Sequence, residues 1–405
     1  MTATRMVRRL AWGGTIAALA GLWLLAARAL WGTTVPADLS LPELDVLDYF
    51  TAAEIDLAER FERVLLMLTV FSTFAVLVSL GALAALGRHL GRRIGLGRIA
   101  TGILLGVLSL TVVWMIVLPF EVASEWWQRR HGLSRASYAD TLTASWVGLL
   151  IEVTAAALII AAGMGLAARL RRYWWVVAAP ALTALTIGLV FAQPYLFVDA
   201  ETLRRPALVR DARSLARSIG VEGTPVKVDE VHKDTTQANA LALGLGSTSR
   251  IILWDTLLDG RFRPGEIRVV IAHEFGHIAR KHLWKGVAWS ALFTVPILLL
   301  VAELTRLRGG LADPAAIPLL LLLLVAVQLV VAPLYNVISR RYEQEADWTA
   351  LQATRDPASA TELFRRFATT SLGDPNPPAW AHILLGTHPT TIERIEMAES
   401  FAERR

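Results

Sequence analysis

The chain has 405 residues, of which 54% are hydrophobic and 19% charged, and its mean hydropathy is +0.48. Because the apolar residues are also clustered in long blocks, these values exclude an ordinary soluble enzyme. The lack of cysteine excludes disulfide bonds, thiol catalysis and cysteine-ligated metals. The formal charge of +5 comes mostly from arginines in short loops beside the apolar blocks, which predicts contact with the lipid bilayer and no nucleic acid partner.

Seven apolar runs predict a polytopic, mainly α membrane protein, because each run is near or above the ~20 residues that cross the hydrocarbon. We therefore expect about seven transmembrane helices. The first run has flanks like those of a signal peptide, but its length favours an uncleaved anchor. The runs are Ala11 to Leu30, Val64 to Leu86, Ile99 to Pro119, Leu142 to Ala167, Trp174 to Leu196, Val287 to Leu307 and Ala315 to Val337.

A sizeable polar stretch, residues 198–265, follows the fifth run. Its first part, Leu203 to Ile219, has the apolar spacing of a helix. Asn239 to Leu245 and Arg250 to Trp254 then predict two strands of a hairpin, with a Gly-Ser turn between them. An edge strand of this kind can hold a peptide backbone by β-augmentation, although a strand that merely covers the core fits the sequence equally well.

The next segment, residues 271–279, reads IAHEFGHIA and contains an HExxH motif. On a helix, His273 and His277 lie one turn apart on one face and can share a zinc ion. Glu274, rotated to the side, can then act on the attacking water without binding the metal. Two histidines on a helix can also be ordinary surface or core residues, so the motif alone is not specific.

A third ligand is available after the seventh run, where residues 339–347 read SRRYEQEAD. Glu343 and Asp347 are four residues apart and share one face of a continuing helix. Glu343 would complete a His2Glu zinc site with one open position, and Asp347 would accept the free ring N–H of a zinc histidine. Glu345 points elsewhere on that helix, and we expect it to be a solvated carboxylate.

The two motifs agree with the predicted spans. His277 precedes the sixth run by about ten residues and Glu343 follows the seventh by about six, so both lie roughly 10–15 Å outside the same membrane face. The intervening hairpin thus returns the chain to the zinc. The predicted organisation is a transmembrane domain of about five spans (1–197), a small α+β zinc metallopeptidase domain with the HExxH helix (198–286), a transmembrane hairpin (287–338) and the C-terminal part of the peptidase domain (339–405).

Six segments carry a resemblance to a known family: Leu118–Phe120 with Arg130–Leu133, Ala238–Gly244, Ile251–Leu258, the HExxH helix, residues 339–347, and Thr387–Pro389 with Glu393–Ile395. They resemble the membrane-integral CAAX prenyl protease family of zinc metalloendopeptidases, which is related to the bacterial heat-shock membrane protease. HExxH alone is weakly specific, but its combination with SRRxExxAD and a late His-Pro is highly specific.

The resemblance implies one zinc ion per chain and further site residues. His388 would lie near the zinc and donate to the oxyanion, and Asn239 and Ala240 match the family's substrate-binding strand. Arg394 either pairs with an acidic residue that supports the site or is a solvated charge. The other histidines are expected at the interface or surface, among them His89, His232, His282 and His382.

The predicted function is that of a zinc metalloendopeptidase acting on membrane-associated or unfolded polypeptides. Eukaryotic members cleave prenylated CAAX peptides, but this arginine-rich, alanine-rich and lysine-poor composition indicates a bacterial plasma membrane, where such substrates are not expected. The alternative is a catalytically idle scaffold or chaperone-like binder of hydrophobic segments. The intact His273, Glu274, His277, Glu343 and Asp347 argue against it. A transporter fits less well, because the spans carry few ionisable residues.

The membrane side of the zinc domain stays open. Basic segments at Arg5 to Arg9, Arg88 to Arg98 and Arg169 to Arg172 place the N-terminus inside, which after five spans puts the zinc domain outside the cytoplasm. The family resemblance implies the cytoplasmic side instead. The sequence also leaves the natural substrate, the cleavage preference and the oligomeric state undetermined.

Overall fold

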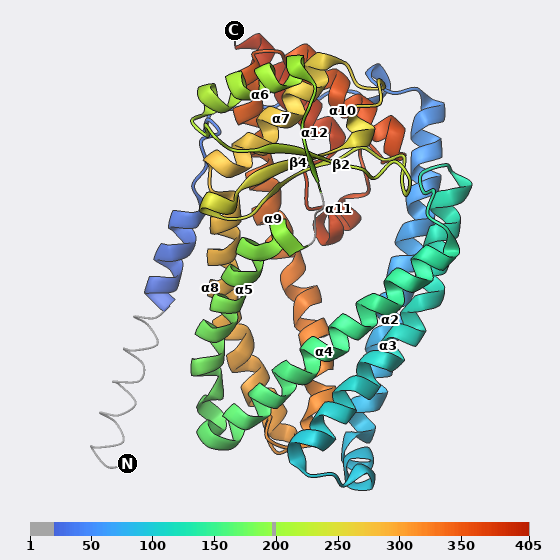
Figure 1. Ribbon diagram of the computed structural model, residues 1–405, viewed down its shortest axis with the longest axis vertical. Coiled ribbons are helices and arrows are strands. Elements are labelled where there is room, and N and C mark those ends of the chain that lie inside the picture. The colour runs from blue at the N-terminus through green and yellow to red at the C-terminus, as the bar shows by residue number, and fades with distance from the viewer. Residues whose placement is uncertain (1–19, 197–199, 405) are drawn as a thin grey trace.

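The computed structural model describes residues 20–196 and 200–404, and most of them are helical. Figure 1 shows long helices that extend from one end of the molecule, where a small sheet and shorter helices gather. The long helices are α2 (Ala52–Ile94), α3 (Arg98–Arg130), α4 (Tyr138–Leu170), α5 (Trp174–Leu196), α8 (His282–Thr305) and α9 (Ile317–Thr354). The shorter ones are α6 (Pro206–Ile219), α7 (Pro264–Ala279), α10 (Pro357–Ser371), α11 (Ala379–Leu385) and α12 (Thr391–Glu403). We call the sheet with α6, α7 and α10 to α12 the polar end.

Five helical stretches in the described residues are long and apolar enough to cross a membrane. One of them, Tyr138–Tyr195, contains both α4 and α5, which a short turn at Arg171–Tyr173 separates. The prediction of a multi-pass membrane protein is therefore confirmed. Of the first predicted span, Ala11 to Leu30, residues 20–30 are described and belong to a shorter apolar helix, Ala20–Trp31, while residues 11–19 lie outside the described residues, so a count of seven stays a prediction.

The polar end holds a four-stranded sheet in the order β1-β2-β4-β3. Its strands are β1 (Glu201–Thr202), β2 (Val226–Asp229), β3 (Ala240–Leu243) and β4 (Arg250–Trp254). The predicted hairpin is present, since β3 and β4 pair antiparallel. β2 runs parallel to β4, an arrangement that the alternation of apolar residues did not predict. β3 is an outer strand of the sheet, and it lies close to α7.

Helix α7 packs against α9 at close range, and a glycine of the HExxH motif makes this possible. A Cβ atom on Gly276 would lie 3.2 Å from the Ala346 Cα atom, which is tighter than ordinary van der Waals contact. Ile271, Ala272 and Phe275 on the same helix are fully buried in the main hydrophobic core. The small residues at the contact therefore set the spacing between the two helices that carry the predicted ligands.

The chain leaves the contact between α7 and α9 through a bend into α8, and it returns to the contact along an unbroken α9. Lys281 takes a left-handed backbone conformation (φ 57°) between α7 and α8, so the two helices change direction sharply. Helix α9 instead continues without interruption from Ile317 through Glu343 to Thr354, as the sequence predicts. The seventh predicted span and the third predicted ligand thus belong to one helix.

Candidate metal centre

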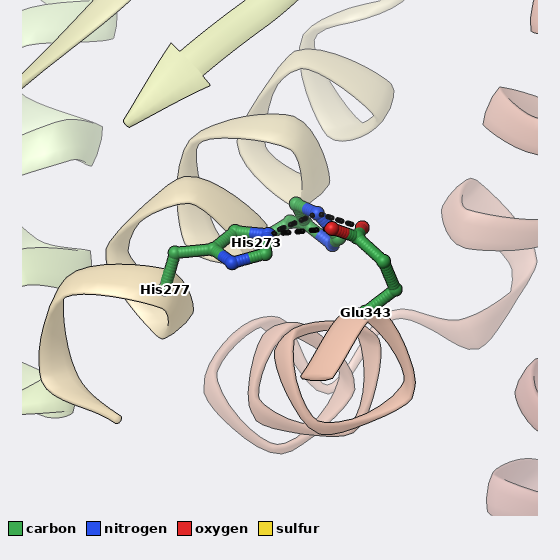
Figure 2. A group of neighbouring side chains, drawn as sticks. All are labelled: His273, His277 and Glu343. Atoms are coloured by element: carbon green, nitrogen blue, oxygen red, sulfur yellow. Dashed lines mark hydrogen bonds and ion pairs between the residues drawn. The ribbon is translucent and has the colours of Figure 1, made fainter. Parts of the chain in front are cut away.

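Three side chains from two helices converge inside the polar end, as Figure 2 shows. His273 and His277 come from α7, and Glu343 faces them from α9. The Nε2 atoms of the two histidines are 3.0 Å apart, and carboxylate oxygens of Glu343 lie 3.2 Å from the first and 3.5 Å from the second. Two imidazole nitrogens and one carboxylate arranged in this way can bind a tetrahedral metal ion and leave one position open.

The chemistry of this group fits a cation. The Glu343 Oε2 atom is buried, and although His273 Nε2 lies 3.2 Å and His388 Nε2 3.4 Å away, it accepts no hydrogen bond of good geometry. Burial lowers the pKa of His273, but the Asp347 and Glu343 carboxylates outweigh it and raise that pKa to about 10. The site therefore stabilises added positive charge while it leaves a buried acceptor unpaired. Both properties are those of residues that hold a divalent metal ion.

Asp347 and Arg394 hold His273 in place. The Asp347 Oδ1 atom lies 2.7 Å from the His273 Nδ1 atom, so the ring donates there and its Nε2 atom stays available to a metal. Arg394 on α12 donates two hydrogen bonds to the same carboxylate, at 2.7 and 2.8 Å. Because Arg394 pairs with Asp347, the solvated alternative for Arg394 is wrong.

Glu274 lies beside the three converging side chains and is itself buried. Burial raises the pKa of its carboxyl group, and the electrostatic influence of the nearby His273 and His277 rings offsets part of this increase. A hydrogen bond with the Ala242 backbone also holds the carboxylate. A carboxylate in such a setting is suited to take up a proton and release it again.

A cavity of about 260 Å³ opens onto this group, and His388 forms part of its wall. The His388 Nε2 atom lies 3.4 Å from Glu343 Oε2, and the side chain is 57% exposed. The loop between α11 and α12 therefore brings a distant part of the chain back to the ligands. An imidazole in this position can donate a hydrogen bond to a negative oxygen that develops in the cavity.

Strand β3 and the residue before it line the same cavity, including Asn239, Ala240 and Ala242. The Trp254 N–H donates to the Asn239 carbonyl, so the backbone of Asn239 faces β4. Alternate residues of a strand direct their backbone groups to opposite sides, so Ala240 and Ala242 face the open edge. The hydrogen bond between Ala242 and Glu274 agrees with this register. Backbone groups that pair with no other strand therefore lie directly beside the candidate metal ligands.

Two residues near the site differ from expectation. Glu345, predicted to be solvated, is only 1% exposed, and His282, predicted at the surface, is only 6% exposed. Their side chains contact each other, with 2.9 Å between His282 Nε2 and Glu345 Oε2. Helical spacing places Glu345 off the ligand face, but it does not show that the sharp turn at Lys281 folds α8 over that side of α9.

Comparisons with known proteins agree with this geometry. Residues 202–402 match Peptidase family M48. The "Uncharacterized metalloprotease YhfN" of Bacillus subtilis is 31% identical over 245 residues, which cover 57% of each chain. CAAX prenyl protease 1 of Saccharomyces cerevisiae is 34% identical over 126 residues, or 31% of this chain and 27% of that one. The chain thus aligns with little more than half, or less, of the length of these relatives.

A solved structure resembles the whole chain. The crystal structure of S. mikatae Ste24p superposes with a TM-score of 0.74, covering 95% of this chain and 96% of that chain. The sequences are 20% identical, so this likeness concerns the fold alone. The common fold includes the long helices as well as the polar end.

Proposed function

Since residues 202–402 match Peptidase family M48 and the chain has helices long and apolar enough to cross a membrane, we propose that it is a membrane-embedded zinc metalloendopeptidase. The observation that carries the proposal is the convergence of His273, His277 and Glu343 on one point, with Glu274 beside them in a cavity. This donor set favours zinc, because two imidazoles and one carboxylate with an open position are typical of catalytic zinc sites.

The substrate is a polypeptide held in extended form along β3. A peptide strand adds to the sheet by β-augmentation at the Ala240 and Ala242 backbone groups, which face away from β4. It replaces the contact of the Ala242 backbone with Glu274. Asn239 lies at the start of this edge, where its side chain accepts a hydrogen bond from the Ala240 N–H at 2.8 Å. A peptide in this register passes directly over Glu274 and the metal ligands, which places its carbonyl group in the cavity.

Each side chain has one role in hydrolysis. When bound, zinc supplies Lewis acidity, which acidifies the attacking water and polarises the peptide carbonyl. Glu274 accepts a proton from that water and later gives it to the leaving amine. His388 donates a hydrogen bond to the oxyanion. Asp347, held by Arg394, keeps the His273 ring in its ligating orientation.

We further propose seven transmembrane helices, with the segment before α2 as the first. The peptidase domain then comprises residues 198–286 and 339–405, joined through the α8–α9 hairpin. The composition favours a bacterial plasma membrane and an unprenylated substrate, either a membrane-associated or an unfolded polypeptide.

Cleavage of an unprenylated, unfolded protein by the detergent-purified enzyme tests this function. We expect the zinc-loaded wild type to cleave it, and both a chelator-treated sample and Glu274→Gln to be inactive, with zinc still bound in the variant. Removal of the general base lowers turnover by about 10²–10⁴-fold. Substantial cleavage by Glu274→Gln would remove Glu274 from its role, and cleavage that survives chelation would contradict a metal mechanism.

A further inference from the structure

Two buried side chains outside the predicted site connect His277 to the opposite side of α9. The His277 Nδ1 atom lies 3.0 Å from the His282 Nδ1 atom. The other ring nitrogen of His282 lies 2.9 Å from Glu345 Oε2. The His282 and Glu345 side chains are 4% and 1% exposed, so water does not compete for these contacts. The chain thus forms a continuous polar connection from a candidate metal ligand to a buried carboxylate.

The protons along this connection can be assigned from the atoms alone. Glu345 is an acceptor, so His282 donates to it through Nε2–H. A neutral His282 then has a lone pair on Nδ1, and His277 must donate its Nδ1–H there. In that tautomer His277 keeps its Nε2 lone pair, and the Nε2 atom is the one that faces Glu343 at 3.5 Å. The arrangement therefore leaves His277 ready to bind a cation.

The surroundings fix both members of the connection. The Tyr342 ring stacks on the His282 ring, with 4.7 Å between centroids and 10° between planes. The Thr34 N–H donates to Glu345 Oε1 at 2.7 Å, and the Lys285 ammonium lies 3.2 Å from Oε2. Lys285 balances the charge of the buried carboxylate, so Glu345 stays an acceptor. These neighbours therefore hold the His282 ring and the Glu345 carboxylate in their present orientations.

We propose that His282 is a positioning residue: with Glu345 it holds His277 in the tautomer and orientation that bind the metal. This inference rests on the metal site of the proposed function. His282 then does for His277 what Asp347 does for His273, although through an additional imidazole. Hydrogen-bonding partners of this kind typically change metal affinity by about 10–100-fold.

Two substitutions separate the two hydrogen bonds of His282. His282→Asn places an amide oxygen near the position of Nδ1, so it retains an acceptor for His277 and loses the contact with Glu345. His282→Gln places its amide near the position of Nε2, so it retains the contact with Glu345 and loses the one with His277. His282→Leu removes both, and His89→Leu, at an exposed histidine, is the control.

The measurement is the zinc dissociation constant by chelator competition, together with the thermal midpoint of the metal-free protein. We expect about 10–100-fold weaker zinc binding in the Leu and Gln variants, a smaller loss in the Asn variant and none in the control. If the Leu variant does not fold, the Asn and Gln pair still decides the result. Equal zinc affinity in the Gln variant and the wild type, or equal losses in the Asn and Gln variants, would overturn the proposal. A wild type that binds no zinc would instead overturn the proposed function.

Discussion

The polar end and the membrane helices bury their side chains to very different extents. In α7, ten of 16 residues are buried, including Glu266, His273 and Glu274. In the apolar windows of the candidate spans, the buried share runs from 6% in α2 to 33% in the stretch that begins at His282. Lipid solvates apolar side chains as well as a protein core does, so helices in a membrane gain little from burying them against each other. The polar end depends on specific buried contacts, whereas the spans depend on lipid.

The largest difference in stability loss is expected between a buried and an exposed ion pair. Arg394→Met leaves the Asp347 carboxylate buried with only His273 as a partner, which costs about 3–5 kcal/mol. Arg204→Met removes an ion pair with Glu201 whose side chains are 82% and 63% exposed, which costs at most about 1 kcal/mol. Thermal unfolding in detergent measures both. Similar shifts of the two midpoints would contradict the importance of the Asp347–Arg394 pair.

A matched pair of phenylalanines compares the two environments directly. Phe275 on α7 is fully buried, and Phe275→Ala should destabilise the protein by about 3–5 kcal/mol through the cavity that it leaves. Phe74 on α2 is 66% exposed, and Phe74→Ala should change stability by no more than about 0.5 kcal/mol. The thermal midpoints of both variants in the same detergent give the comparison. A large loss for Phe74→Ala would show that another surface covers this face of α2.

His388 is an exposed side chain with a proposed role in catalysis, so its replacement should affect activity and not stability. Because it is 57% exposed, His388→Ala should leave the thermal midpoint unchanged. Loss of an oxyanion donor should lower kcat by about 10²–10³-fold. The exposed His232, which pairs with Asp255 elsewhere, provides a control as His232→Ala. An unchanged kcat in His388→Ala would remove this residue from the mechanism.

The smallest changes in stability are expected at two glycines, where the same substitution destabilises the polar end and stabilises a membrane helix. Gly276→Ala brings a methyl group against the α9 backbone and should cost about 1–3 kcal/mol. Gly188→Ala on α5 meets no atom within 4 Å and should stabilise the helix by up to about 1 kcal/mol. Thermal midpoints with and without zinc measure both changes. If Gly276→Ala were as stable as Gly188→Ala, the spacing between α7 and α9 would not be critical.

The comparison also explains what could be predicted from the sequence. Long apolar runs identify the spans because a bilayer requires them, and HExxH with a later Glu343 identifies the candidate ligands because helical spacing fixes which residues share a face. The pairing of β3 with β4 follows from alternation around a turn. The contact of His282 with Glu345 could not be predicted, because it depends on the angle between α8 and α9. The sequence does not encode that angle in a local pattern. The parallel pairing of β2 with β4 is likewise a long-range choice.

Helix α9 joins the two environments in one continuous element. Its 38 residues give a length of about 57 Å, nearly twice the hydrocarbon thickness of about 30 Å. A change in bilayer thickness that tilts the membrane part of this helix, before Pro333, therefore also displaces the later part, which carries Glu343. Pro333 lies between the two parts and cannot donate a backbone hydrogen bond, so bending concentrates there. The lipid composition of the membrane sets the bilayer thickness, and through the tilt of α9 it therefore affects the distance between Glu343 and the two histidines.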